Sequence, residues 1–537
     1  MIGTRKWERT LAYVHRIGLV DDIETHLREG RGGRRRGLRV DVLLAAMMLT
    51  YQDGGNLTLK RVHANLTTLP LGVKEQYGLT DIKVHNVYYL WSRVTRLHDF
   101  SHNTRPGLDA VERAEREERF QHFLDRMAGA AGDHIRPTGR WAADASAIES
   151  AARGGSAPRD EDGNIDGTKP TGSYDRDARW GYRTKTYDNK TNKLFGYQLH
   201  ALVRVGKPGE DVPHLIDRFT LTPGNDYDVA HTIDMFDTLA RDGIQPVEVL
   251  SDRGYSYTGP EKWATQLTSR GITQVLDMHK ADRGPHGHDD GYLMIDGWPH
   301  HPSIPEHLVT IERPARMTVG PRPANVDKVK LAAWEKRRDG VRAFTDLMAQ
   351  RELYRYDRVA KAKTPGGSER YRCPGKSGKI RCEGCATVDA QWGYVDAPHV
   401  HLTPDGVIPK ACQQATITIR GDVDRKLRQD LPWGSPEWIA HFGRRTRVEG
   451  YFGLMKSADG DGSVRRGWTR QVGRVKTGML LAIAIAAHNL QQLTHWAARH
   501  GDTTDPLTTM DTTVGEFVEL PTPPAPTDPG TAPPTAA

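Results

Sequence analysis

Residues 442–456 read FGRRTRVEGYFGLMK and combine apolar and charged residues at regular spacing. Four apolar residues recur with the period of a helix, which predicts one packed helix face; they are Phe442, Val448, Phe452 and Met455. Arg445 and Glu449 are four residues apart and Lys456 is seven further on, so the three share a second face. A surface salt-bridge ladder would give the same charges. The packed face beside them favours a helix whose charged side lines a cleft.

Two aspartates follow segments with the composition of buried strands. Asp144 comes after Trp141-Ala-Ala, where a short strand is expected to end in a polar turn. Asp252 ends the segment 245–252 and precedes Arg-Gly-Tyr, whose glycine permits a tight turn. Acidic side chains at the strand ends of an α/β sheet are exposed where ligands bind. Each aspartate alone is better explained as a turn-forming or helix-capping residue; a site shared with Glu449 is the alternative.

Strand and helix patterns alternate around the two aspartates. Strand composition is found at 141–146, 195–205, 213–221, 245–252 and 273–278, and helical periodicity at 232–242 and 262–270. This alternation predicts an α/β domain whose first part spans 138–280. His200, in the second of these strands, fits either a residue that orients a carboxylate or phosphate, or a core histidine with satisfied hydrogen bonds.

The part of the chain before this domain is expected to be helical. Helical periodicity recurs at 38–50, 57–66, 84–97 and 108–129. The first three of these helices resemble a helix-turn-helix module, and a plain three-helix packing domain is an equal alternative. We therefore expect a helical DNA-binding region at 38–130, preceded by a basic segment at 1–37 that becomes irregular near its end.

Residues 281–437 break the alternation and are interpreted as an insertion. They contain a Gly/His/Asp-rich loop, a charged helix expected at about 326–351 and short strand-like pieces around the cysteines. The core then resumes at 438–500, with helices expected at 438–456 and 473–499.

The insertion holds all the cysteines of the chain, Cys373, Cys382, Cys385 and Cys412. One Cys-x2-Cys pair and a Cys-Pro-Gly turn are present, and four thiolates can hold a structural zinc ion. A second close pair would make the pattern convincing. Free thiols or packing cysteines are therefore preferred over zinc.

The composition bounds the compartment and the kind of partner. The 537 residues carry a net charge of +7, which suits a polyanion without proving one. Four cysteines argue against a disulfide scaffold and for a reducing compartment. The longest apolar run, 479–487, is far short of the roughly 20 residues that cross a bilayer. We expect a cytoplasmic, nucleoid-associated protein with no membrane partner, and a disordered Pro-rich tail at 501–537.

The motifs around the acids resemble those of the DDE transposases of bacterial insertion sequences, in the group with a Tyr-x2-Arg-x3-Glu-x6-Lys signature. Arg445, Glu449 and Lys456 match the spacing, and Phe442 stands at the position of the tyrosine. Further segments resemble the group's motifs in the same order; they are Asp144–Glu149, Phe195–His200, Thr222–Asp228 and Leu250–Tyr255.

The resemblance covers about 140–280 and 438–495, and more loosely 38–100. It implies an α/β fold with a ribonuclease H-like catalytic core and a large insertion before the last catalytic helix. An all-α DNA-binding region would precede this core.

The resemblance also implies the roles of individual residues. Asp144, Asp252 and Glu449 would be catalytic and would hold two Mg²⁺ or Mn²⁺ ions, with Asp144 bridging both. Two such cations can activate the attacking oxygen and stabilise the leaving oxygen. Arg445 and Lys456 would bind DNA phosphates, the arginine by a bidentate fork.

Two features near the signature leave alternatives open. Phe442 keeps an aromatic face for stacking on a displaced base, worth about 1–3 kcal/mol, but lacks the hydroxyl, so cleavage with and without a hairpin intermediate are both alternatives. Arg465 and Arg466 lie beside Trp468, which fits contact with the DNA backbone or a solvated loop equally well.

We therefore expect a transposase that binds terminal inverted repeats and target DNA and performs cut-and-paste transposition, as a homodimer in the synaptic complex. A non-catalytic DNA-binding regulator or a domesticated derivative would need the helical region but not the three acids. A metal-dependent nuclease of the same fold without strand transfer is not separable from the transposase by sequence.

Overall fold

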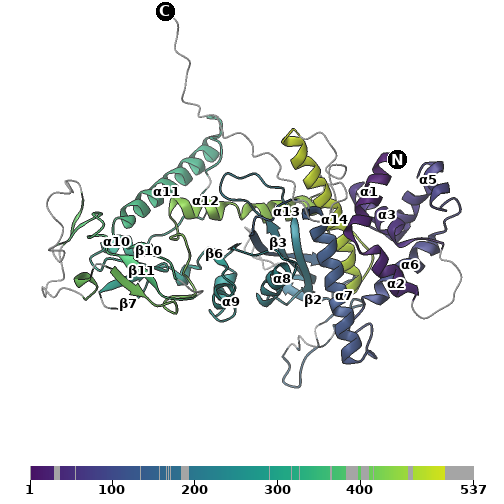
Figure 1. Ribbon diagram of the computed structural model, residues 1–537, viewed down its shortest axis with the longest axis horizontal. Helices are drawn as coiled ribbons and strands as arrows, with labels where there is room; N and C mark the ends of the chain where they lie inside the picture. Colours follow the sequence, from purple (N-terminus) through teal and green to yellow (C-terminus); the bar gives the residue numbers. More distant parts are fainter. Residues whose placement is uncertain are drawn as a thin grey trace, which may run out of the picture.

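The structure is a computed structural model, and it describes residues 2–28, 37–54, 56–133, 135–156, 158–164, 166, 169, 171–182, 193–289, 291–315, 317, 319–325, 327–362, 366–382, 397–400, 410–414, 416–457 and 464–501. The molecule is elongated (Figure 1). Helices from the N-terminus form one end, a mixed sheet lies in the middle, and smaller sheets with a long helix form the other end.

The central sheet has six strands and confirms the α/β class. They are β1 (Arg140–Glu149), β2 (Arg179–Tyr182), β3 (Lys193–Arg204), β4 (Ile216–Pro223), β5 (Glu248–Ser251) and β6 (Thr273–Leu276). The order is β2–β3–β1–β5–β6, and β4 also pairs with β3. β3 is antiparallel to β1, β2 and β4, whereas β5 is parallel to both β1 and β6.

The strands lie close to the segments predicted from the sequence, with two differences. β1 continues to Glu149, so Asp144 lies in the middle of this strand and not at its end as predicted. The reason is that β3 is long enough to pair with β1 as far as Glu149. β2, with the sequence RWGY, has no counterpart among the predicted strands.

Helices cover both faces of the sheet. α7 (Ala110–Gly129) and α14 (Arg474–Arg499) pack against β4 on one face. α8 (Ala230–Arg241) and α9 (Ala264–Ser269) pack on the other face, around Trp141, Phe236 and Val249. Both helices of the second group were expected within two residues of their observed bounds.

The N-terminal region contains more helix than the sequence predicts. Its helices are α1 (Thr4–Ile17), α2 (Val20–Arg28), α3 (Val40–Gln52), α4 (Leu59–Thr67), α5 (Leu71–Gln76) and α6 (Val84–Leu97). α3, α4 and α6 match the expected helices. α1 and α2 were not expected within 1–37, although Trp7, Leu11 and Val14 bury one face of α1 against α3. The expected irregular end of this segment falls on 29–36, outside the described residues.

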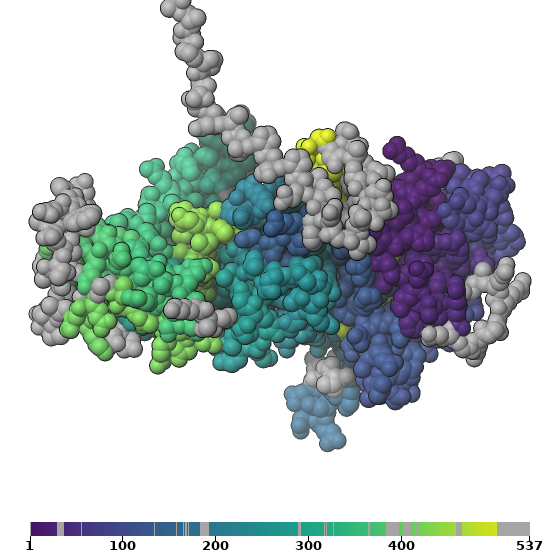
Figure 2. Space-filling model, in the orientation of Figure 1, coloured from purple at the N-terminus to yellow at the C-terminus, as the bar shows by residue number. Residues whose placement is uncertain are grey.

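The region 281–437 forms a lobe beside the central sheet, drawn mostly in green in Figure 2. Its long charged helix, α11 (Lys328–Glu352), matches the expectation. The remaining helix is α10 (Glu306–Val309), and the strands are β7 (Pro285–Asp289), β8 (Tyr292–Ile295), β9 (Trp298–His300), β10 (Asp357–Ala360), β11 (Glu369–Arg372), β12 (Arg381–Cys382), β13 (His399–Val400) and β14 (Thr416–Ile419). The strands pair as β7–β8–β9, β10–β11–β14 and β12–β13.

The helix expected at 438–456 is in fact two helices, α12 (Pro436–Gly443) and α13 (Thr446–Lys456). Within the residues that the structure describes, short 3₁₀ turns lie at Ala130–Gly132, Tyr255–Tyr257, Lys280–Asp282 and Lys410–Gln413. The predicted tail at 501–537 lies outside the described residues from 502 onward. Among the described helices, none combines the length and the apolar character that a membrane crossing requires.

Candidate active site

Asp144 and Asp252 lie side by side because of the register of two parallel strands. Ala142 of β1 pairs with Leu250 of β5, and both side chains belong to the core beneath α14. Side chains alternate along a strand, so Asp144 and Asp252, each two residues further on, face the same side. β5 ends at Ser251, and the Asp252 carboxylate accepts a hydrogen bond from the Gly254 N–H at 2.8 Å.

Glu449 reaches the two aspartates from α13, which packs on β1. The helix buries one face, on which lie Val448, Tyr451, Phe452 and Met455. The Tyr451 hydroxyl fixes this face by donating a hydrogen bond to Asn489 Oδ1 of α14 at 2.7 Å. Glu449 lies on the other face and its side chain is 59% exposed.

Arg445 joins the three acids. Its guanidinium lies 2.8 Å from Asp144 Oδ2, 3.6 Å from Asp252 Oδ2 and 2.6 Å from Glu449 Oε1. The side chains of Arg445 and Asp144 are only 11% and 19% exposed, so water screens this contact less than the contacts with the more exposed Asp252 and Glu449. The structure therefore brings together all three carboxylates proposed from the sequence, around one cation of the same signature.

The environment shifts the pKa of two of these groups. Burial raises the pKa of Asp144 to about 6, with Asp252 adding to the increase and Arg445 opposing it. Burial lowers the pKa of Arg445, but Asp144, Asp252 and Glu449 outweigh this effect and leave it above the ordinary value. The site thus gathers three carboxylates around one guanidinium, which offsets only part of their negative charge.

The donor set suits a hard divalent cation, because Mg²⁺ and Mn²⁺ prefer carboxylate oxygens. Within the described ranges, however, no three His, Cys, Asp or Glu side chains stand close enough to hold a metal ion as they are placed. The guanidinium of Arg445 lies between the carboxylates instead. The oxygen chemistry of the three carboxylates fits a cation, and Arg445 contacts one oxygen of each carboxylate.

A cavity of about 490 Å³ opens beside the carboxylates. Asp144, Asp252 and Lys456 belong to its wall, and Tyr182 and Tyr227 stand at its exposed side. The Tyr227 hydroxyl accepts from the Tyr182 N–H at 2.8 Å and donates to its carbonyl at 3.0 Å. Neither tyrosine was proposed from the sequence. Tyr227 lies in the Thr222–Asp228 turn motif, a signal that could have identified it.

Lys456 does not project freely into this cavity. Its ammonium donates to Ser146 Oγ at 2.7 Å and to the Ala147 carbonyl at 2.5 Å, so it ties the end of α13 to β1. The expected contact of Lys456 with a DNA phosphate stays a prediction.

His200 lines the same cavity but is a buried, hydrogen-bonded residue. Its Nε2 lies 3.0 Å from Thr222 Oγ1, and its ring contacts His231 with centroids 5.1 Å apart. Burial, followed by the neighbouring His231, lowers the pKa of His200 to about 4. It is therefore neutral near pH 7 and matches the core-histidine alternative.

Phe442 lies in α12 and is not among the residues that line this cavity. Its ring stacks on Trp438 with centroids 4.7 Å apart and planes 8° apart. The Arg313 guanidinium lies 5.7 Å from the centre of the same ring. One face of Phe442 is thus already covered by Trp438, and the base stacking expected of Phe442 stays a prediction.

Arg465 and Arg466 are exposed in the segment between α13 and α14. Arg465 Nε donates to the Lys456 carbonyl at 3.1 Å, which places this side chain next to the C-terminal end of α13, the helix that carries Glu449.

Two of the four cysteines are described together with their side chains. Cys373 is buried and Cys382 is half-buried. Cys382 Sγ lies 3.5 Å from Nε2 of the buried His301, a residue not considered in the sequence-based zinc site. Cys385 and the side chain of Cys412 lie outside the described residues, so the proposed four-thiolate site stays a prediction.

No protein-family model, curated protein or solved structure matches this chain.

Proposed function

We propose that the protein is a DDE-type DNA transposase, in which Asp144, Asp252 and Glu449 form the catalytic centre. The convergence of these three carboxylates on Arg445, from β1, the end of β5 and α13, carries the proposal. Asp252 and Glu449 are 197 residues apart in the sequence. A surface salt-bridge ladder within one helix would not bring these acids together.

The proposal includes a ribonuclease H-like core. Apart from the four-residue β2, the strands run β4–β3–β1–β5–β6, an antiparallel trio followed by two parallel strands. A ribonuclease H-like sheet has this arrangement, with one catalytic acid on its first strand and another after its fourth. Asp144 and Asp252 occupy these two positions, and the region 281–437 is an insertion before the helix of Glu449.

Asp144, Asp252 and Glu449 would hold the divalent cations, two Mg²⁺ or Mn²⁺ ions in all. When bound, such ions activate the attacking oxygen and neutralise charge on the phosphate and the leaving oxygen. Arg445, once displaced from the carboxylates, is placed to bind a phosphate oxygen beside the scissile bond. Lys456, which lies at the other end of the charged face of α13 from Arg445, is proposed to bind a second phosphate.

The first test combines cleavage and binding. Purified protein incubated with Mg²⁺, a DNA end of the element and a target plasmid should yield cleaved ends joined to the plasmid. Asp252→Asn should abolish cleavage but leave the affinity for the DNA end within about twofold, because the substitution removes a metal ligand and not a DNA anchor. Loss of end binding in this variant would contradict the assignment.

The same experiment separates the alternatives. Cleavage without joining indicates a metal-dependent nuclease of this fold. End binding without cleavage at any Mg²⁺ or Mn²⁺ concentration indicates a DNA-binding regulator or a domesticated derivative. Denaturing gels of the cleaved ends decide whether a hairpin forms, because a sealed end runs as a single strand of double length.

A further inference from the structure

α6 presents an unusual outward face. Its exposed residues follow helical spacing, and they are Val84, His85, Tyr88, Tyr89, Ser92 and Arg96. Tyr88 and Tyr89 are 43% and 56% exposed. The helix has the sequence VHNVYYLWSRVTRL, without an aspartate or glutamate, and its opposite face is buried in the N-terminal core. Aromatic, hydroxyl and basic side chains without acidic neighbours are the groups that contact bases and phosphates of DNA.

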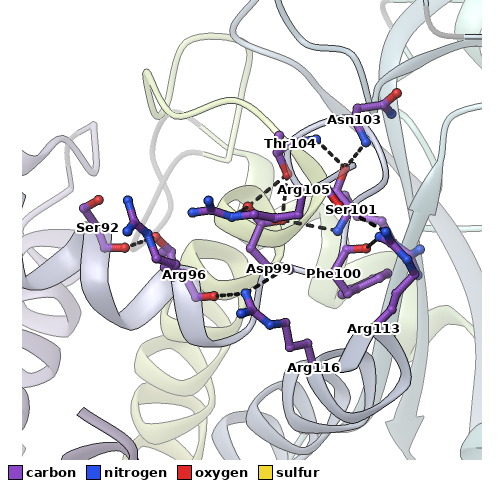
Figure 3. A network of polar contacts seen from close by, with 12 residues as sticks. Ser92, Arg96, Asp99, Phe100, Ser101, Asn103, Thr104, Arg105, Arg113 and Arg116 are labelled. Carbon is purple, nitrogen blue, oxygen red and sulfur yellow. Dashed lines mark hydrogen bonds and ion pairs between the residues drawn. The ribbon is translucent and has the colours of Figure 1, made fainter. Parts of the chain in front are cut away.

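The C-terminal end of α6 leads into a notch of about 230 Å³ beside the start of α14. Arg96, Arg105 and Lys476 line it together with two acids. Both acids are already satisfied: Asp99 accepts from Thr104 Oγ1 at 2.7 Å (Figure 3), and Asp177 accepts from Ser101 Oγ at 2.6 Å. Among the described residues, the side chains of Arg96 and Lys476 have no ion-pair or hydrogen-bond partner. Three cations and two carboxylates line the notch, so one positive charge is left for an anion.

A basic segment connects this notch to the candidate active site. Residues 464–476 read VRRGWTRQVGRVK and contain no carboxylate. At one end, Val464 N–H donates to the Met455 carbonyl at 2.9 Å, next to Lys456. At the other end, Gly473 and Lys476 line the notch.

A third hollow lies along the middle of this segment. It has a volume of about 640 Å³, and Arg470 and Val472 line it together with Tyr174, which is 86% exposed. Val472 also lines the notch, so the two hollows adjoin. The basic segment thus runs from the residue next to Lys456, past two adjoining hollows, to the C-terminal end of α6.

We propose that these features form one DNA track. A duplex lies with a groove against the outward face of α6, and its phosphates contact Arg96, Lys476 and Arg470 on the way to the carboxylates. The proposal rests on the proposed function for the chemistry at the end of the track. Charge favours DNA as the occupant, because a repeating row of phosphates matches a row of cations without carboxylates.

Fluorescence anisotropy with the full chain tests the track. The probe is a labelled mixed-sequence duplex about three helical turns long, in EDTA and at several salt concentrations. Arg96→Gln, Arg470→Gln and Lys476→Gln should each weaken binding about threefold to tenfold and reduce the slope of log affinity against log salt by about 1. Tyr88→Ala should weaken binding at each salt concentration and leave the slope unchanged, because it removes no charge.

Lys336→Gln, an exposed cation of α11 in the distant lobe, is the matched control and should change neither quantity. Equal slopes for wild type and all three track variants would overturn the track, as would an equal loss in Lys336→Gln or no binding of the duplex at low salt. Because no divalent cation is present, these results do not depend on catalysis. If the three track variants reduce the salt slope as expected but the protein never cleaves DNA, the DNA track is supported and the transposase proposal is contradicted.

Discussion

At the scale of single residues, Arg445 decides how the candidate site is arranged. Its guanidinium contacts carboxylates from three elements and its side chain is 11% exposed. Oppositely charged groups at these distances attract each other strongly where water is scarce. A divalent cation held by these carboxylates, as proposed, would compete with Arg445 for their oxygens.

Arg445→Gln should raise the affinity for Mn²⁺ about tenfold or more in the absence of DNA, because the competing charge is gone. Isothermal titration calorimetry with the full chain measures this affinity. Arg447→Gln removes a cation of the same helix that contacts none of the three acids, and should leave Mn²⁺ binding unchanged. An unchanged or weaker Mn²⁺ affinity in Arg445→Gln would show that the arginine does not compete with metal.

At the scale of elements, α14 joins the sheet to the helices around it. Its Asn489 is fully buried and accepts from the Ile216 N–H at 3.2 Å and from the Tyr451 hydroxyl at 2.7 Å. The amide nitrogen of Asn489 donates to the carbonyls of Ala128 and Ile216, both at 2.9 Å. One side chain therefore ties α14 to α7, β4 and the helix that carries Glu449.

Asn489→Ala should lower the free energy of unfolding by about 2–4 kcal/mol, because it leaves several buried polar groups without partners. His495→Ala, an exposed position of the same helix, should change stability by less than about 0.5 kcal/mol. Denaturant unfolding followed by circular dichroism compares the two. Equal stability of both variants would mean that water replaces the lost hydrogen bonds.

At the scale of the whole molecule, one hydrophobic core runs from the N-terminal helices through one face of the sheet to α14. Several histidines are buried within or near it. Burial lowers the pKa of His98 to about 4, that of His200 to about 4 and that of His300 to about 3. Burial has the opposite effect on Asp125 and raises its pKa to about 6.

Acidification from pH 6.5 to pH 5 should therefore destabilise the protein. In this range the unfolded chain binds protons at histidines that stay neutral when folded, so each costs about 2 kcal/mol by pH 5. Asp125 and Asp144, whose pKa values burial raises to about 6, act in the other direction below pH 6, but each contributes only about 1 kcal/mol by pH 5. Urea unfolding at both pH values measures the net loss, and His98→Gln should lose less than wild type. An increase in stability on acidification would contradict this account.

Much of the fold could be predicted from local patterns. β3, β4, α6 and α11 lie within a few residues of their predicted bounds, because periodicity and turn residues report on nearby backbone. The spacing of Trp7, Leu11 and Val14 indicates the helix α1. The helix was not predicted, because the segment was interpreted from its basic composition alone. The end of β1 was misplaced, because the polar residues after Asp144 resemble a turn and only pairing with β3 keeps them extended.

By itself, the sequence determined the α/β alternation and the spacing of Arg445, Glu449 and Lys456, since both depend on neighbours along the chain. Only the tertiary structure decided that Arg445 contacts Asp144 and Asp252 as well. It also decided that Phe442 stacks on Trp438 and that Lys456 is bonded to β1. These contacts join side chains set by strand register and helix packing, and no local pattern encodes such distances.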